Sequence, residues 1–137
     1  MITNAQSNTR VDEVATRIYR ISTPVTNIPG GFSFNRYLVV DDAPLLFHTG
    51  PRGMFPLTRD AIAAVIPVER LRYVGFSHFE NDESGALNEL LAVAPEALGG
   101  TPQTYPQTYL LLSPLGGLWT QGRASDVPLC PLVRLPP

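Results

Sequence analysis

The chain has 137 residues and a mass of 15.0 kDa, which fits one domain with a buried core. Hydrophobic residues make up 44% and charged residues 16%, a balance that excludes a wholly disordered chain. The net charge is -2 and every basic residue is an arginine, so no basic excess is available to bind a nucleic acid.

Neither secretion nor membrane insertion is predicted. The start of the chain lacks a basic stretch followed by an apolar one, so it is not a secretory signal. The most apolar run, 109–119, contains Pro114 and two glycines and is too short to span a bilayer. Cys130 is the only cysteine, which excludes an intrachain disulfide and a Cys-rich zinc site. We therefore expect a cytoplasmic protein without a membrane partner.

The first half of the chain predicts three strands. Residues 1–13 are polar and are expected to be disordered. The β-branched and aromatic residues of 14–25 predict a strand that ends near Pro24. The sequence NIPGG at 27–31 is typical of a turn, and a second strand follows from Phe32. After a turn at Asp41–Pro44, the run at 45–49 predicts a third short strand.

Two helices and a fourth strand are predicted next. Thr58 is suited to cap a helix over 59–66, which carries an apolar stripe of Ile62, Val65 and Ile66. The nearly continuous apolar run at 71–79 predicts a buried strand. From Ser84 the spacing becomes helical, with an apolar stripe that Pro95 ends: Leu87, Leu90, Leu91 and Ala94.

The character of the chain changes after Leu98. Residues 99–137 hold only three charged residues, together with seven prolines and five glycines. Tyr109–Leu112 predicts one strand, and the rest is expected to be irregular. We therefore divide the chain into a disordered start at 1–13, a folded unit at 14–98 and a tail at 99–137.

The segment that carries chemistry is SHFENDESG at 77–85, where the fourth strand gives way to a helix. Side chains alternate in an extended chain, so His78, Glu80 and Asp82 are able to point to one side. One imidazole and two carboxylates suit iron or manganese better than zinc. A structural interpretation stays open beside this one, in which Asp82 or Ser84 caps the helix and His78 is a half-buried histidine.

These residues resemble the H-x-E-x-D motif of the flavodiiron proteins and the related oxygen-binding di-iron proteins of the metallo-β-lactamase superfamily. The order and spacing of NIPGGFSFNRYLVVDDAPLLFHTGP and of VERLRYVGFSHFENDESGALNELLAVAP are also similar, over roughly 14–97. Hydrolases of the superfamily carry a second His where Glu80 stands. The resemblance implies an α/β fold, the αββα sandwich of this superfamily, limited here to its N-terminal half.

The resemblance also implies metal ligands. His78 and Glu80 would bind one iron and Asp82 a second iron, whereas Glu83 stands where many relatives have another His. The family uses three further ligands, two His and a bridging Asp, which have no counterpart here because His48 and His78 are the only histidines. His48 stands where many relatives carry the Asp of a D-T-G turn, which implies that it orients a ligand. A half-buried strand histidine is the alternative.

Three functions follow as hypotheses. In the first, complete relatives bind or reduce dioxygen or nitric oxide at two irons, with electrons from an external donor and no FMN in this segment. The second is a zinc-dependent hydrolase of the same superfamily. The third is a non-catalytic remnant or an interaction module that forms a homodimer. The abrupt change at 98–99 further suggests a truncated or frameshifted reading of a longer gene, so iron binding is expected to be weak.

Overall fold

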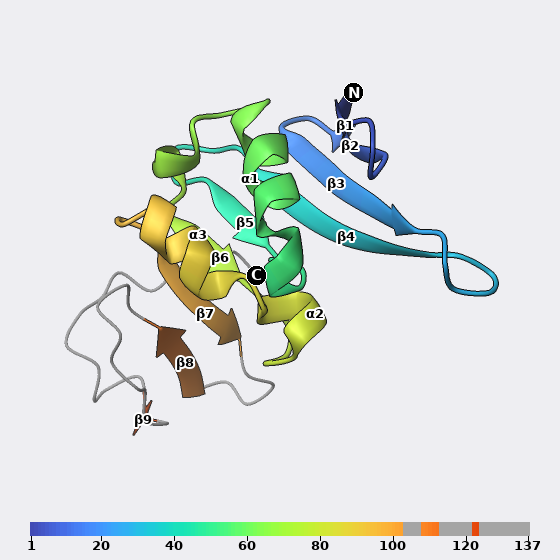
Figure 1. Cartoon of the computed structure of the whole chain (residues 1–137). Helices are drawn as coiled ribbons and strands as arrows, with labels where there is room; N and C mark the ends of the chain where they lie inside the picture. The colour runs from blue at the N-terminus through green and yellow to red at the C-terminus, as the bar shows by residue number, and fades with distance from the viewer. Residues whose placement is uncertain (103–107, 113–121, 124–137) are drawn as a thin grey trace.

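The computed structural model describes residues 1–102, 108–112 and 122–123. Their strands form one mixed nine-stranded sheet, in which the spatial order follows the order along the chain (Figure 1). Pairing is antiparallel from β1 to β5, parallel from β5 through β6 to β7, and antiparallel again to β9. The strands are β1 (Ile2–Asn4), β2 (Thr9–Ala15), β3 (Ile18–Val25), β4 (Phe32–Val39), β5 (Leu45–Phe47), β6 (Tyr73–Gly75), β7 (Leu98–Pro102), β8 (Thr108–Leu112) and β9 (Gly122–Arg123).

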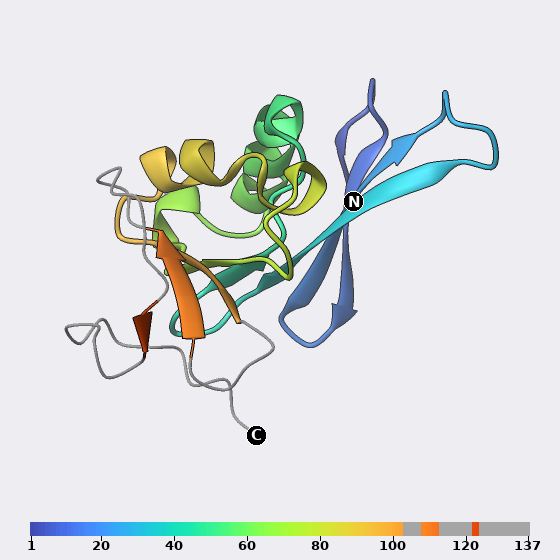
Figure 2. The ribbon, with the colours of Figure 1, turned by 90° about the horizontal axis from the view of Figure 1, so that it is seen from below.

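The helices lie together on one face of the sheet (Figure 2). They are α1 (Phe55–Ala63), α2 (Asn81–Ser84) and α3 (Leu87–Val93), with two short 3-10 helices, η1 (Arg52–Met54) and η2 (Val68–Arg70). The core fills the space between this layer and the sheet, and its fully buried members include Ile21, Leu38, Leu46, Ile62, Val74, Phe76 and Leu90. Helices on one face of a mixed sheet are the arrangement expected of half of an αββα sandwich.

The N-terminal residues are ordered, which corrects the expectation of a disordered segment at 1–13. Residues of β1 pair with β2, and β2 pairs with β3 over most of its length. Thr9 and Val11 are buried, and the N-terminal ammonium donates to the carbonyl oxygen of Val11 at 2.7 Å. The pairing partner lies further along the chain, so local polarity alone gave the wrong expectation.

The single strand expected at 14–25 is two strands joined by a tight turn. Arg17 adopts a left-handed backbone conformation with φ of 62°, which reverses the chain between β2 and β3. The turn expected at 27–31 is confirmed, because Gly30 and Gly31 have φ of 85° and 73°. The hairpin of β3 and β4 extends well beyond the helices (Figure 1), and Phe32 contacts Phe34 edge to face at 4.9 Å near its end.

The first helix differs from its predicted position. It begins at Phe55 rather than after Thr58, with Pro56 in its first turn, where the missing N–H has no cost. Thr58 is therefore inside the helix and fully buried, and it does not cap the helix. The predicted strand at 71–79 is reduced to β6, because the chain leaves the sheet after Phe76, whose N–H still donates to the carbonyl of Gly100 in β7 at 3.2 Å.

The second helical region contains two short helices, since Gly85 and Ala86 separate α2 from α3. The apolar stripe predicted from Leu87 to Ala94 is buried, as its spacing indicated. In the tail, β7 continues the sheet beside β6, and β8 contains the strand predicted at 109–112. Cys130 and the remaining residues of the tail lie outside the described part of the chain.

Candidate functional site

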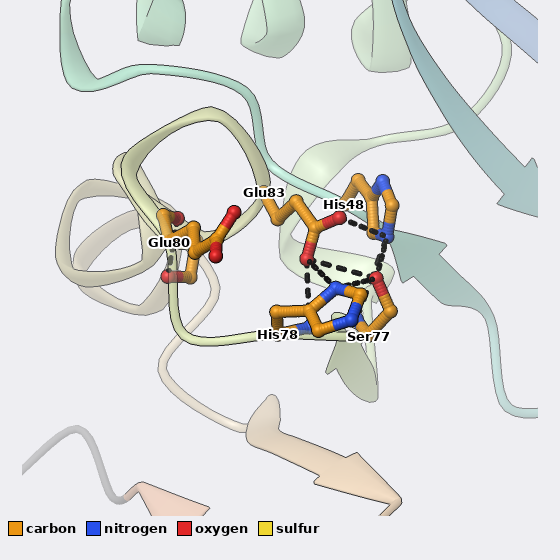
Figure 3. Close-up of polar contacts among 6 residues, drawn as sticks. His48, Ser77, His78, Glu80 and Glu83 are labelled. Carbon is orange, nitrogen blue, oxygen red and sulfur yellow. Dashed lines mark hydrogen bonds and ion pairs between the residues drawn. The ribbon is translucent and has the colours of Figure 1, made fainter.

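The candidate site lies where the parallel strands β5 and β6 end. His48 follows β5, and Ser77 and His78 follow β6 after Phe76. Because carboxyl ends of neighbouring parallel strands meet at one edge of a sheet, residues 29 positions apart become neighbours there. Glu83 joins them from α2 (Figure 3). We refer to His48, Ser77, His78 and Glu83 as the loop cluster.

The Glu83 carboxylate is the centre of the loop cluster. Its Oε2 accepts hydrogen bonds from the hydroxyl of Ser77 at 2.8 Å and from the backbone N–H of His78 at 2.7 Å, and it lies 3.0 Å from Nδ1 of His78. Burial raises the pKa of Glu83, but the hydrogen bonds from Ser77 and His78 outweigh it, so the pKa lies below its ordinary value. An ionised Glu83 is an acceptor only, and its contact therefore places a proton on Nδ1 of His78.

His48 is held against the loop cluster by an unusual backbone conformation. Its φ is 65°, in the left-handed region that His, Asn and Asp enter more readily than other side chains. Its Nε2 lies 3.0 Å from Oγ of Ser77 and 3.9 Å from Oε1 of Glu83, and its ring stacks on Phe47. Burial lowers the pKa of His48, and the neighbouring carboxylates offset part of that effect. The geometry is compatible with a residue that orients His78 through Ser77.

Glu80 and Asp82 lie beside the loop cluster without joining it. Glu80 directly precedes α2, and its backbone carbonyl accepts hydrogen bonds from the N–H and the hydroxyl of Ser84 at 2.8 and 2.9 Å. Figure 3 shows Glu80 apart from the loop cluster, with no contact drawn from its carboxylate. Its side chain and that of Asp82 are exposed, and neither is paired with an arginine among the described residues.

The capping interpretation of this segment is not what the structure shows. Glu80 occupies the position before α2, and no side chain caps the helix there. Ser84 lies at the end of α2, and its hydroxyl donates back to Glu80. Asp82 lies in the first turn, where its charge is favourable to the helix dipole. His78, Glu80 and Asp82, the three residues that the spacing predicts as ligands, thus all lie in the exposed loop after β6 and the first turn of α2.

The described residues do not fit a di-iron centre. Across 1–100, where side chains are described, no three His, Cys, Asp or Glu side chains form a group that could hold a metal ion. His78 directs Nδ1 to Glu83, whereas its exposed ring leaves Nε2 toward solvent. Metal binding by His78, Glu80 and Asp82 therefore stays a prediction, and two prepositioned metals have no support here.

The sequence pattern does not predict the contacts of Ser77 and Glu83. Nothing in the pattern marks Ser77, and Glu83 is marked only by the position that it shares with a family histidine. The helical turn of α2 brings Glu83 back onto the backbone of His78, five residues earlier. An acid placed five residues after a strand-end histidine is the signal that could have found this contact.

Comparisons with known proteins bear on the fold. No protein-family model matches the sequence, and no curated protein matches it. Among solved structures, a mutant of a flavo di-iron protein from Thermotoga maritima matches with a TM-score of 0.58 and 21% identity over 63% of this chain and 25% of that chain. The rubredoxin oxygen:oxidoreductase from Desulfovibrio gigas matches with a TM-score of 0.57 and 23% identity, over 63% and 24% of the two chains. A metallo-beta-lactamase mutant from Cronobacter sakazakii gives a TM-score of 0.55 and 18% identity over 66% and 33%.

The chain therefore has the fold of part of a metallo-β-lactamase domain, and the resemblance to flavodiiron proteins is confirmed for the fold. It spans about a quarter of the length of the flavodiiron chains that it matches. The expected α/β class, with helices against a mixed sheet, is also confirmed. None of the helices in the described part of the chain has the length and apolar character needed to cross a bilayer.

Proposed function

We propose that this chain carries the first part of a metallo-β-lactamase-fold protein of the oxygen-binding di-iron type. Such a protein, in complete form, binds or reduces dioxygen or nitric oxide with electrons from an external donor. The observation that supports this proposal is the pattern His78, Glu80 and Asp82 after β6, in a fold similar to that of flavodiiron proteins. Iron, where bound in such a protein, supplies the site that holds the diatomic molecule.

The chain's own residues limit what it does alone. Glu83 fixes the Nδ1 side of His78, so Nε2 is the ring nitrogen left for a metal ion. Glu80 and Asp82 have exposed side chains two and four residues further along the same segment, and a metal ion bound there would take its remaining coordination positions from water. We therefore propose weak, exchangeable binding of one divalent ion by His78, Glu80 and Asp82, oriented through the loop cluster that includes His48.

Zinc-dependent hydrolysis is the second candidate, favoured by the likeness to the metallo-beta-lactamase from Cronobacter sakazakii. Glu80 in place of a histidine argues against it, because neutral imidazoles suit zinc better than an added carboxylate does. Metal analysis separates the two candidates. Retention of about two zinc ions favours hydrolysis, whereas a preference for iron or manganese favours the di-iron type.

The test measures Mn²⁺ affinity of the metal-free chain by electron paramagnetic resonance. His78→Ala, Glu80→Gln and Asp82→Asn should each weaken binding at least severalfold. Asp42→Asn, which removes an exposed carboxylate from the turn between β4 and β5, should leave binding unchanged. Equal affinity in all four variants would contradict the assigned residues. Absence of any binding in the unmodified chain would favour the interaction module, which sizing chromatography would then test.

A further inference from the structure

Arg36 is a buried cation without a carboxylate partner among the described residues. It lies in β4 with its side chain fully covered, between the sheet and α1. Its Nε has no hydrogen-bond partner in the described part of the chain. Burial lowers the pKa of Arg36 to about 10, so the guanidinium stays charged at neutral pH. An unpaired buried charge usually costs stability relative to an apolar side chain of the same size.

The contacts of Arg36 lead from the hairpin to the loop after β5. One terminal nitrogen donates to the hydroxyl of Thr23 in β3, and the other donates to that of Thr58 at 2.8 Å. The hydroxyl of Thr58 in turn donates to the backbone carbonyl of Thr49 at 3.2 Å. The backbone carbonyl of Met54 is a second acceptor for the same hydroxyl, also at 3.2 Å. Arg36, Thr58 and Thr49 thus form a buried polar chain, which we call the strut.

Thr49 connects the strut to the segment that holds the candidate site. Its backbone N–H donates to the carbonyl of Glu83 at 2.7 Å. Its hydroxyl accepts from the N–H of Ala86 at 3.0 Å and donates to the carbonyl of Gly50 at 2.9 Å. The N–H of Ala86 also donates to the carbonyl of Gly50, at 3.1 Å. The backbone of Glu83 is therefore held by Thr49, while the carboxylate of Glu83 holds His78.

Gly50 allows the strut to approach this closely. Its φ is 76°, and a Cβ atom placed there would lie 3.1 Å from Nη1 of Arg36. Any other residue would meet both the left-handed backbone conformation and the guanidinium. A glycine at position 50 therefore lets the backbone of this turn pack directly against the Arg36 guanidinium.

We propose that Arg36 is a positioning residue, which acts through Thr58 and Thr49 to fix the Glu83 backbone and thereby the orientation of His78. This proposal rests on the proposed function in one respect, that His78 is the residue that faces the metal ion. The experiment is carried out without metal, so its result can be interpreted even if the chain binds no metal ion.

The experiment records the ring ¹⁵N shifts of His78 and the amide exchange rates of Thr49 and Ala86 in the full chain. In the unmodified chain, His78 should be mainly the Nδ1–H tautomer. Arg36→Met should move His78 toward a mixture of tautomers and speed exchange at Ala86 about tenfold, the factor expected for one lost buried hydrogen bond. The free energy of unfolding should stay the same or rise, because Met replaces an unpaired buried charge.

Variants of Thr58 provide the rescue. Thr58→Val should reproduce the shifts of Arg36→Met, and Thr58→Ser should restore the unmodified spectrum, because it keeps the hydroxyl. Ile62→Val, a core truncation in α1 outside the strut, should change neither readout. Unchanged His78 shifts in Arg36→Met and Thr58→Val would overturn the proposal. So would similar shifts in Ile62→Val, or unfolding of both strut variants, since Arg36 would then serve the fold alone.

Discussion

One carboxylate oxygen of Glu83, Oε2, makes three polar contacts. That oxygen accepts from Ser77 and from the backbone and ring of His78. A histidine binds a metal ion through the ring nitrogen that does not contact its hydrogen-bond partner. In His78 this nitrogen is Nε2, because Nδ1 contacts Glu83. At the scale of single residues, Glu83 is therefore as important to the candidate site as the residues of the motif.

The lowered pKa of Glu83 gives a pH dependence. The pKa is lower in the folded chain than in the unfolded chain, so the contact contributes stability at neutral pH. That contribution declines as the pH falls below 4.5 and is lost once the pH passes the folded pKa. Glu83→Gln should lower the free energy of urea unfolding at pH 7. In this variant the free energy of unfolding should also fall less steeply with pH below the pKa that Glu83 has in the unfolded chain.

Glu69→Gln, at an exposed position in η2, is the control and should leave both the free energy of unfolding at pH 7 and its pH dependence as in the unmodified chain. Equal behaviour of the two variants would contradict this account.

The left-handed conformation of His48 predicts an unusual order of substitutions. A β-branched side chain bears the full cost of this region, about 1–2 kcal/mol, whereas Asn enters it readily. Val and Asn at position 48 both remove the contact of the His48 ring with Ser77. The difference in the free energy of unfolding between the two variants therefore reports the backbone cost alone. Urea denaturation should show His48→Val less stable than His48→Asn by about 1 kcal/mol. Equal stability of the two would mean that the chain relaxes to another conformation at this position.

At the scale of elements, the position of α2 depends on Gly85. A Cβ atom there would clash with the backbone oxygen of Asn81 and would lie 3.0 Å from the backbone nitrogen of Arg52. Neither backbone atom is able to move without shifting α2 or η1. Gly85→Ala should therefore lower the free energy of unfolding by about 1–3 kcal/mol, the usual cost of overpacking.

Gly53 offers the matched control, because a Cβ atom there would have no neighbour within 4 Å and the residue lies in the adjacent η1. Gly53→Ala should change the free energy of unfolding by less than about 0.5 kcal/mol. Thermal and urea unfolding of both variants measure the difference. A Gly85→Ala variant as stable as Gly53→Ala would show that α2 is not held against the turn at η1.

Elements with a strong local pattern could be predicted from the sequence. The stripe from Leu87 to Ala94 and the turn at Gly30 and Gly31 needed only spacing and residue type. The strands at 1–13 could not be predicted, since they form by pairing with each other and with β3, and Thr9 and Val11 are buried only in the assembled fold. The start of α1 was misplaced because Thr58 has the residue type of a cap but uses its hydroxyl inside the core.

The candidate site shows the same division. The run of His78, Glu80 and Asp82 is predicted to follow a buried strand, and it does follow β6, whereas its role as a metal site stays a prediction. The loop cluster could not be predicted, because His48 meets Ser77 only through the parallel pairing of β5 and β6. Contacts between residues far apart in the chain depend on register, which a single sequence does not define.

For the molecule as a whole, the fold brings the loop of His78, Glu80 and Asp82 to the edge of the sheet, and no group of three side chains able to hold a metal ion forms among the described residues. A metal ion is held firmly when three or four protein ligands are prepositioned and supported by further contacts. Of His78, Glu80 and Asp82, only the His78 side chain has such support from a residue that the structure describes, namely Glu83. We therefore expect this chain to bind a single divalent ion weakly and to form no stable di-iron centre.

The most direct test is an anaerobic titration of the metal-free chain with Fe²⁺, followed by desalting, air exposure and elemental analysis. We predict that the titration saturates near one ion per chain and that desalting removes most of the iron. No absorption band of an oxo-bridged iron pair should develop in air. Two irons per chain that survive desalting, together with such a band, would contradict the account.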